Sequence, residues 1–400
     1  MARRRYKRAK RRRRRRSLSA SNWGPILKLL AVILGFLALL YLVLYVAVPK
    51  VADIIGIEYR APFTPEATPA PTPRPTPTPH PMKTYDFAAN SAELVFDGSS
   101  NYKWFTDPYF YDGRMIVSAG KLASDGKNVA FRDMFFFDPE TRAAEKLSLS
   151  PENDHFMYPK FNGRWLVYLD ADMSEGGAIM VVDLTASSLK PVKVKDIYSG
   201  QPEPFLSDNY VAFMDRTGTT KDKLFVYDLN TMESTVVAMF TNSVYGQSKP
   251  FIAGNTLIWG DSATSGGSSD TSVLNYIYIN SSTVKSVNTG TFIHDPECNA
   301  RYTAWLTEVH SRDTQLYAMT GFGGTPFLVD SGVVEFGLGS DFIAYSRNES
   351  IYVYMFDSDS IYRLTQDYEQ AMFLGVSDDH VMWMDVTSRE RDIVKFIEIP

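Results

Sequence analysis

Four aspartates recur at one position of a repeated sequence pattern, which makes them the first candidates for chemistry. They are Asp170, Asp215, Asp261 and Asp385, and each stands two residues after an aromatic residue of a predicted strand. If the repeats form a ring, the four carboxylates could gather on one face and bind a cation, a basic peptide or a polyhydroxylated ligand. The alternative is that each carboxylate accepts backbone amides in its own turn. Because the residue recurs with the repeat, we favour this structural interpretation.

Other signatures of catalysis or metal binding are missing from the sequence. It has no Gly-x-Ser-x-Gly nucleophile turn and no His-Glu-x-x-His zinc motif. His155, His294, His310 and His380 lie in different repeats, without the spacing of metal ligands. We therefore assign no catalytic, cofactor-binding or metal-binding residue. Residues 84–400 contain 43 acidic side chains, so a carboxylate pair for acid–base catalysis stays open as an alternative.

The elements that would position these residues recur at a period of roughly 40–50 residues, which is typical of a β-propeller. In each repeat, the first residue of a short strand is followed nine positions later by a residue in the middle of a second strand. The second residue is aromatic in six of the seven pairs, which are Tyr109/Ser118, Pro159/Tyr168, Pro204/Phe213, Pro250/Trp259, Pro296/Trp305, Phe336/Tyr345 and Leu374/Trp383. The pattern predicts an all-β, seven-bladed propeller. Six blades are the alternative, because the first repeat departs most from the others.

Each predicted blade contains four strands, which we denote a to d along the chain. The clearest repeat places strand a at Pro204–Leu206, strand b at Tyr210–Met214, strand c at Leu224–Tyr227 and strand d at Thr235–Phe240. Proline suits the first position of a strand, where it costs no ladder hydrogen bond. The aromatic residue of strand b is expected to fill the wedge between adjacent blades.

The last repeat supplies strands a to c before Pro400, and its strand d must come from elsewhere. The segment Ala92–Asp97 precedes the first repeat and has no partner of its own. We expect it to pair with Ile393–Ile399, because this pairing closes the ring and removes an exposed strand edge.

The repeats resemble the WD-like repeats of the TolB propeller family. The shared features are a strand, a short turn, a strand ending in an aromatic residue, and a hydrophobic strand ending in aspartate, as in 135–138 and 180–183. The resemblance covers about residues 90–400. It implies the propeller fold for this part of the chain.

The amino-terminal part predicts a membrane anchor. Residues 29–48 are twenty consecutive residues without a charge, and a helix of this length spans about 30 Å, the thickness of the hydrocarbon core. Residues 3–16 contain twelve Lys or Arg, and basic flanks stay in the cytoplasm. We therefore expect a basic cytoplasmic tail (1–24) and an uncleaved transmembrane helix (25–48) that contacts the lipid bilayer.

Two other interpretations of the amino terminus are less favoured. Signal peptides have apolar stretches of about 7–15 residues and a small-x-small cleavage site, whereas this stretch is longer and no clean site follows it. A basic run can also neutralise the phosphates of nucleic acid. Beside a transmembrane helix, we expect the run to contact anionic lipid headgroups instead, and we do not expect a nucleic acid partner.

A linker is predicted between the anchor and the propeller, over residues 49–83. Residues 61–82 contain nine prolines and five threonines, a composition that favours an extended polyproline II spacer. The spacer would hold the propeller, residues 84–400, away from the bilayer. The charge distribution agrees with two different surroundings, because residues 1–50 have fourteen basic and no acidic side chains while residues 51–400 have a net charge of −19.

These elements together predict a single-pass protein of the cell membrane with an extracytoplasmic propeller. The first functional hypothesis is a non-catalytic binding or scaffold module for a protein or a glycan of the cell envelope. The alternative is a propeller enzyme that acts on cell-wall or extracellular polymers through a carboxylate pair. No cofactor is expected in either case.

The predicted topology can be tested with a protease. Because the propeller is expected outside the membrane, protease added to intact spheroplasts should degrade it while a cytoplasmic marker survives. Immunoblotting with antibodies against the propeller would measure the loss. Full protection of the propeller in intact spheroplasts would contradict the predicted orientation.

Overall fold

The protein is described here by a computed structural model of the full chain. The described residues are 28–29, 32–34, 36, 43, 80, 82–83, 91–96, 102–123, 126–216, 222–240, 248–262, 272–281, 283–307, 313–387 and 391–400. Residues 77–400 form one compact unit, which holds all the described strands.

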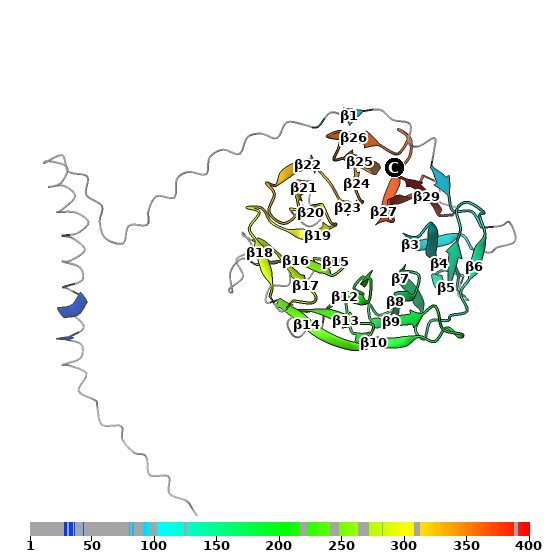
Figure 1. The fold of residues 1–400 in the computed structure, drawn as a ribbon, viewed down its shortest axis with the longest axis horizontal. Coiled ribbons are helices and arrows are strands. Elements are labelled where there is room, and N and C mark those ends of the chain that lie inside the picture. The colour runs from blue at the N-terminus through cyan, green and yellow to red at the C-terminus, as the bar shows by residue number, and fades with distance from the viewer. Residues whose placement is uncertain are drawn as a thin grey trace, which may run out of the picture. The chain divides into compact units, whose positions relative to one another are not determined.

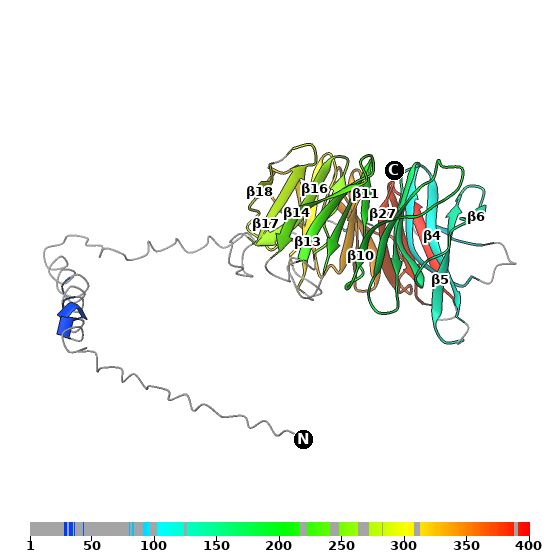
Figure 2. The same ribbon diagram turned by 90° about the horizontal axis from the view of Figure 1, so that it is seen from below.

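Seven sheets stand around a central channel, which confirms the predicted seven-bladed propeller (Figure 1). Figure 2 shows the strands running between the two faces of the ring that carry the loops. From inner to outer, blade 1 contains β3 (Trp104–Tyr111), β4 (Arg114–Leu122), β5 (Val129–Phe137) and β6 (Ala144–Lys146). Blade 2 contains β7 (His155–Phe161), β8 (Trp165–Ala171), β9 (Gly177–Asp183) and β10 (Val192–Ile197). Blade 3 contains β11 (Phe205–Ser207), β12 (Tyr210–Asp215), β13 (Asp222–Asp228) and β14 (Glu233–Phe240).

The other four blades have the same order of strands. Blade 4 contains β15 (Phe251–Ala253), β16 (Thr256–Ser262), β17 (Ser272–Tyr278) and β18 (Lys285–Val287), and blade 5 contains β19 (His294–Cys298), β20 (Tyr302–Leu306), β21 (Gln315–Thr320) and β22 (Phe327–Ser331). Blade 6 contains β23 (Glu335–Leu338), β24 (Phe342–Arg347), β25 (Ser350–Met355), β26 (Ser360–Arg363) and β1 (Met82–Lys83). Blade 7 contains β27 (Ala371–Ser377), β28 (His380–Asp385), β29 (Ile393–Glu398) and β2 (Ala92–Glu93). Strand a is therefore the innermost strand of every blade.

The blades are held together by seven buried apolar clusters, one for each pair of neighbours. The aromatic residue of strand b is buried in six of these clusters and packs against the preceding blade. Trp305 and Tyr345, for example, have no exposed surface. Neighbouring sheets twist and diverge, so large side chains are needed to fill the space between them, and aromatic rings provide this volume.

The predicted pair Tyr109/Ser118 of the first blade is wrong by one residue. Val117, and not Ser118, packs against the preceding blade, in the same way as Tyr168 of the next blade. The corresponding pair is therefore Pro108/Val117. Because side chains alternate between the two faces of a strand, a shift of one residue moves the side chain to the opposite face.

The ring is closed by the pairing that the sequence predicts. Strand β2 pairs antiparallel with β29, with Ala92 opposite Phe396. The pairing continues where the amide of Leu94 donates to the carbonyl of Val394 at 2.8 Å. Blade 7 thus takes three strands from the end of the chain and one from before blade 1, which excludes the six-bladed alternative.

A second amino-terminal strand covers the outer edge of blade 6. Strand β1 pairs in parallel with β26, so the sheet begins two residues before the predicted start of the propeller. The ring nitrogens of His80 lie 2.8 Å from the carbonyl oxygen of Leu328 and 2.7 Å from Oδ1 of Asp359. The pairing covers part of an outer edge that could otherwise recruit another strand.

The predicted membrane anchor falls almost entirely outside the described residues. Within the described part of the chain, no helix combines the length and the apolar character needed to cross a bilayer. The seven residues described between 28 and 43 are helical. The rest of segments 1–24, 25–48 and 49–83 lies outside the description, apart from His80 and strand β1.

Ring closure predicts that Leu94 is important for stability. Its side chain is 6% exposed and packs in the cluster between blades 7 and 1. Leu94→Ala should therefore lower the free energy of unfolding by about 2–5 kcal/mol, measured by thermal or denaturant unfolding. Val95→Ala is the matched control, because Val95 is 45% exposed and its truncation should cost less than about 0.5 kcal/mol. Equal effects of the two substitutions would mean that Leu94 does not hold the ring closed.

Candidate functional site

The candidate site is the central channel, a cavity of about 630 Å³ lined by residues from all seven blades. The inner strands surround it in Figure 1. The strand-a prolines, such as Pro159 and Pro204, are buried, whereas their neighbours on both sides face the channel. This follows from the alternation of side chains along a strand, and it places charged residues such as Lys160 and Glu203 around the channel.

An inner strand leaves one edge of its sheet unpaired, and side chains from neighbouring blades cap this edge. Asp107 of blade 1 accepts from the amide of Tyr158 in blade 2 at 2.9 Å. Glu297 of blade 5 accepts from the amide of Leu338 in blade 6 at 2.7 Å. Ser377 of blade 7 caps the amide of Phe110 in blade 1 in the same way. Neighbouring blades also bond to amides just outside the inner strands, through Asp295 to Lys249, Asp379 to Ser340 and Asp378 to Gly113. Most carboxylates of the channel are thus engaged in structural hydrogen bonds.

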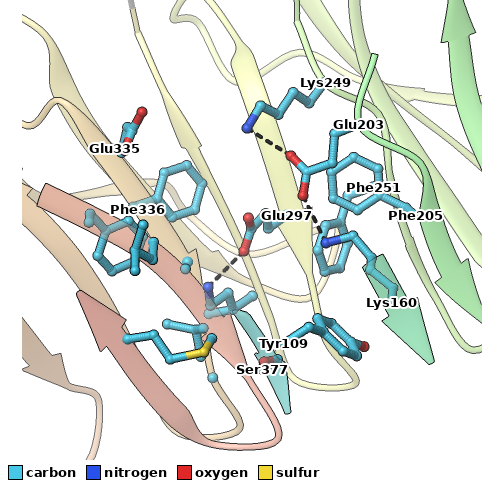
Figure 3. Close-up of a pocket in the computed structure, with 18 of the residues that line it drawn as sticks. Tyr109, Lys160, Glu203, Phe205, Lys249, Phe251, Glu297, Glu335, Phe336 and Ser377 are labelled. Carbon is cyan, nitrogen blue, oxygen red and sulfur yellow. Dashed lines mark hydrogen bonds and ion pairs between the residues drawn. The ribbon is translucent and has the colours of Figure 1, made fainter. Parts of the chain in front are cut away.

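Blades 2, 3 and 4 are linked differently, through two ion pairs that share one carboxylate (Figure 3). Lys160 Nζ lies 2.8 Å from Oε1 of Glu203, and Lys249 Nζ lies 2.9 Å from its Oε2. Lys160 also lies near the rings of Tyr109 and Phe205, at 5.0 and 5.1 Å from their centroids. We call Lys160, Glu203 and Lys249 the charged triad. Its side chains contact one another and not the backbone, so a ligand can replace these contacts without opening a strand edge.

Two members of the charged triad, Glu203 and Lys249, have shifted pKa values. Burial alone would raise the pKa of Glu203, but the two lysines outweigh this effect and lower it to about 2. The charge of Glu203 in turn raises the pKa of Lys249 above its usual value. Glu203 and Lys249 are therefore both charged near neutral pH.

Glu297 lies in the same channel (Figure 3), and its pKa is shifted in the opposite direction to that of Glu203. Burial raises its pKa to about 8, although the amide of Leu338 acts against this shift. Burial also raises the pKa of Asp107 to about 6. The pKa of one carboxyl group in the channel is therefore lowered, and that of another is raised.

The four aspartates singled out in the sequence do not meet in this site. None of them is among the described residues that line the channel. Asp170 accepts from the amides of Glu152 and Asn153 at 2.7 and 3.1 Å, and Asp385 accepts from the amide of Thr387 at 3.0 Å. Asp215 forms an ion pair with Lys195 at 3.1 Å. Asp385 thus accepts an amide of its own turn, as the structural interpretation expects. Asp170 accepts amides of the loop before β7 instead, and Asp215 is held by an ion pair.

The histidines are also dispersed, and His310 lies outside the described residues. His155 accepts from the amide of Phe131 at 3.2 Å, His380 stacks on Phe110 with ring centroids 3.9 Å apart, and His294 is buried at one mouth of the channel. In the described ranges, no group of three or more His, Cys, Asp or Glu side chains could hold a metal ion.

The sequence contained a signal for the triad that the repeated aspartates obscured. Charged residues stand directly beside the strand-a prolines, as in Pro159-Lys160, Glu203-Pro204 and Lys249-Pro250. These residues lie in or just before an inner strand, and all three line the channel. A search for charges at these flanking positions would have identified the site.

Comparisons with known proteins establish the fold of the chain. No protein-family model and no curated protein sequence matches it. Among solved structures, the β-propeller domain of the Trilobed protease from Pyrococcus furiosus is similar with a TM-score of 0.56 at 12% identity, over 76% of this chain and 94% of that chain. The acylaminoacyl peptidase of Pyrococcus horikoshii has a TM-score of 0.54 at 10% identity, over 74% of this chain and 51% of that one.

The chain therefore spans about half the length of this peptidase. TolB from Acinetobacter baumannii is matched with a TM-score of 0.39 at 12% identity, over 72% of this chain and 77% of that one. This similarity is too low to carry an argument about the family. At such identities the comparisons show a β-propeller and nothing finer.

The raised pKa of Glu297 predicts how stability depends on pH. The folded state binds this proton more tightly than the unfolded state, so the stabilisation is complete below about pH 4.5 and is lost as the pH rises through about 8. Glu297→Gln resembles the protonated form. It should match the parent protein at pH 5 and melt several degrees higher at pH 9, as measured by calorimetry.

Glu203→Gln provides the contrasting control. Because Glu203 is stabilised as an anion by two lysines, this variant should be less stable than the parent at both pH values. A Glu297→Gln variant that loses stability at pH 9 would show that Glu297 is held as a carboxylate.

Proposed function

We propose that this protein is a recognition module of the cell envelope that binds its ligand in the central channel of the propeller. The observation that carries the proposal is the charged triad. Three charged side chains from consecutive blades converge on an open cavity of about 630 Å³, within the range of roughly 300–1,000 Å³ that is typical of ligand pockets. A protein segment or a glycan is the proposed ligand.

The accessibility of the triad supports this proposal. The side chain of Lys249 is 54% exposed, whereas those of Lys160 and Glu203 are 13% and 17% exposed. Lys249 is thus an ionised group at the mouth, while the other two lie deeper. A ligand can exchange its own polar groups for the contacts of Lys249 at little structural cost, because exposed ion pairs contribute only about 0–1 kcal/mol to stability.

The location at the envelope is proposed from the sequence of the amino terminus. The apolar residues 29–48 support a single-pass helix within 25–48, and the basic run before it supports a cytoplasmic amino terminus near anionic lipids. The Pro/Thr-rich linker would extend the propeller from the outer surface of the bilayer. A module held in this way can reach proteins or glycans of the envelope.

Catalysis on envelope polymers is the second candidate function, and one observation favours it. Glu203 and Glu297 line the same channel, and their surroundings drive their pKa values to about 2 and about 8. Hydrolysis of a glycosidic bond uses such a pair, in which the carboxyl group of higher pKa acts as the general acid and the group of lower pKa is the ionised carboxylate. The two ion pairs on Glu203 argue against this role, because they make it a weak base.

The binding function can be tested with two matched lysines. Lys249 and Lys193 are both in ion pairs, at 2.9 and 2.8 Å, and their side chains are 54% and 51% exposed. Only Lys249 lines the channel, because Lys193 lies on the outer strand of blade 2. Full-length protein would be used to capture components of an envelope extract, and the affinity for the identified component would be measured with each variant.

Lys249→Ala should weaken the binding at least tenfold, and Lys193→Ala should change it less than twofold. Equal affinities for both variants and the parent would place the ligand outside the channel and contradict the proposal. The catalytic candidate is tested in parallel by incubating cell-wall polymers with the protein. Release of reducing ends by the parent that is abolished in Glu297→Gln would establish catalysis instead.

A further inference from the structure

The inner strand of blade 7 differs in chemistry from the inner strands of the other six blades. Its sequence, AMFLGVS in β27, contains no charged residue. The charged residues of blade 7 that line the channel, Asp378 and Asp379, stand in the turn after this strand. In each of blades 1 to 6, a charged side chain in the inner strand or just before it lines the channel, namely Asp107, Lys160, Glu203, Lys249, Glu297 and Glu335.

The uncharged strand continues into an apolar surface shared with blade 6. We call this surface the apolar wall, and it consists of Phe336, Leu338, Met372, Leu374 and Val376, which all line the channel. Met372 is its most accessible member, with 48% of its surface exposed. A Cβ atom built on Gly375 of the same strand would meet no atom within 4 Å. There is therefore open space beside β27 for an apolar group of a ligand.

The apolar wall lies across the channel from the charged triad. The blades follow one another around the ring (Figure 1), so blade 3, which carries Glu203, is opposite the junction of blades 6 and 7. Figure 3 shows Phe336 on the other side of the cavity from Glu203 and Lys160. The channel is thus amphipathic, with charged groups on one side and aliphatic side chains on the other.

Lys249 can bond to a ligand without leaving Glu203. An ammonium group has three hydrogen-bond donors, and among the described residues Lys249 Nζ makes one ion pair, with Oε2 of Glu203. Its side chain is 54% exposed. An oxygen atom of a ligand at this mouth can therefore accept a hydrogen bond from Lys249 while the charged triad stays intact.

An extended peptide matches both sides of such a channel. Its side chains alternate in direction along the chain, so an aliphatic side chain can lie against the apolar wall while a backbone carbonyl faces Lys249. The amides of Tyr158 and Leu338 in the inner strands already donate to carboxylates. The peptide would therefore be held by its side chain and its carbonyl, without joining a sheet as an added strand.

Two other amphipathic or polar ligands match the channel less well. A sugar has hydroxyl groups on every side, and a hydroxyl group placed against aliphatic side chains loses its hydrogen bonds to water. A fatty acid would bring an anion into a channel where acidic side chains outnumber basic ones, and like charges repel it.

We propose that the channel binds an extended peptide, whose aliphatic side chain lies against the apolar wall and whose backbone carbonyl accepts a hydrogen bond from Lys249. This inference rests on the proposed binding function and selects a protein segment over a glycan as the ligand. It also assigns Met372 as the residue that sets the preference for an aliphatic side chain.

The test uses two matched methionines in the full-length protein. Met372 and Met239 are 48% and 59% exposed, but Met239 lies on the outer strand of blade 3 and does not line the channel. Neither Met372→Ser nor Met239→Ser should lower the melting temperature, because both side chains are exposed. Binding would be measured on blocked peptides, in pairs that differ only by leucine or serine at the central position. Neutral oligosaccharides and laurate form the other arms.

The parent protein should bind the leucine member of a pair about tenfold more tightly than the serine member, since an apolar side chain gains affinity by burial. Met372→Ser should reduce this preference to about threefold or less, whereas Met239→Ser should leave it unchanged. Lys249→Ala should weaken the binding of both members of a pair to the same extent, because it removes the donor to the backbone.

Several results would overturn the inference and leave the proposed function intact. They are equal binding of the leucine and serine members, a leucine preference that survives Met372→Ser, and binding of oligosaccharides or laurate alone. The same holds if the parent binds none of these probes but captures an envelope component that Lys249→Ala loses. If the parent binds no probe and captures nothing from an envelope extract, both proposals fail.

Discussion

The structure depends on how the inner edge of each sheet is satisfied. A propeller blade buries its faces against its neighbours, but its innermost strand must leave an edge of backbone groups beside the channel. In this protein a side chain from an adjacent blade caps that edge, as Glu297 does for the amide of Leu338. The same contacts join the blades, so the requirement to satisfy the edge also holds the ring together at its centre.

These bridges run around the whole ring. Hydrogen bonds to backbone amides join blades 1–2, 4–5, 5–6, 6–7 and 7–1, and the ion pairs of Glu203 join blades 2–3 and 3–4. The difference matters for function. A carboxylate that caps an amide cannot leave it without exposing the edge, whereas a carboxylate between two ammonium groups can exchange partners. The charged groups of blades 2, 3 and 4 can therefore bind a ligand, whereas the carboxylates that accept backbone amides in the other blades are needed for the fold.

The fold was predictable because it repeats. Six aromatic residues at one spacing indicated the wedge positions, and the segment Ala92–Asp97, which has no partner in its own repeat, indicated the closure that β2 and β29 form. The error in the first blade has a physical origin. The wedge position of blade 1 is held by Val117 and not by an aromatic residue, so the aromatic column could not locate it and Ser118 was aligned where Val117 belongs. The bulge between Thr106 and Tyr109 is not the cause, because blades 2 and 5 have the same bulge.

The site was less predictable, because it is formed between repeats. The recurring aspartate is held by contacts that stabilise the fold, because Asp170 accepts loop amides and Asp215 pairs with Lys195 of the preceding blade. Glu203 does not recur, and its two partners come from the blades on either side. Lys160, Glu203 and Lys249 stand beside the strand-a prolines of three consecutive blades, but the sign of the charge differs between blades, so a search for recurring residues passes over them. In this repeat protein, the recurring positions of the pattern thus maintain the fold, and the variable positions beside the innermost strands are where a specific ligand site can arise.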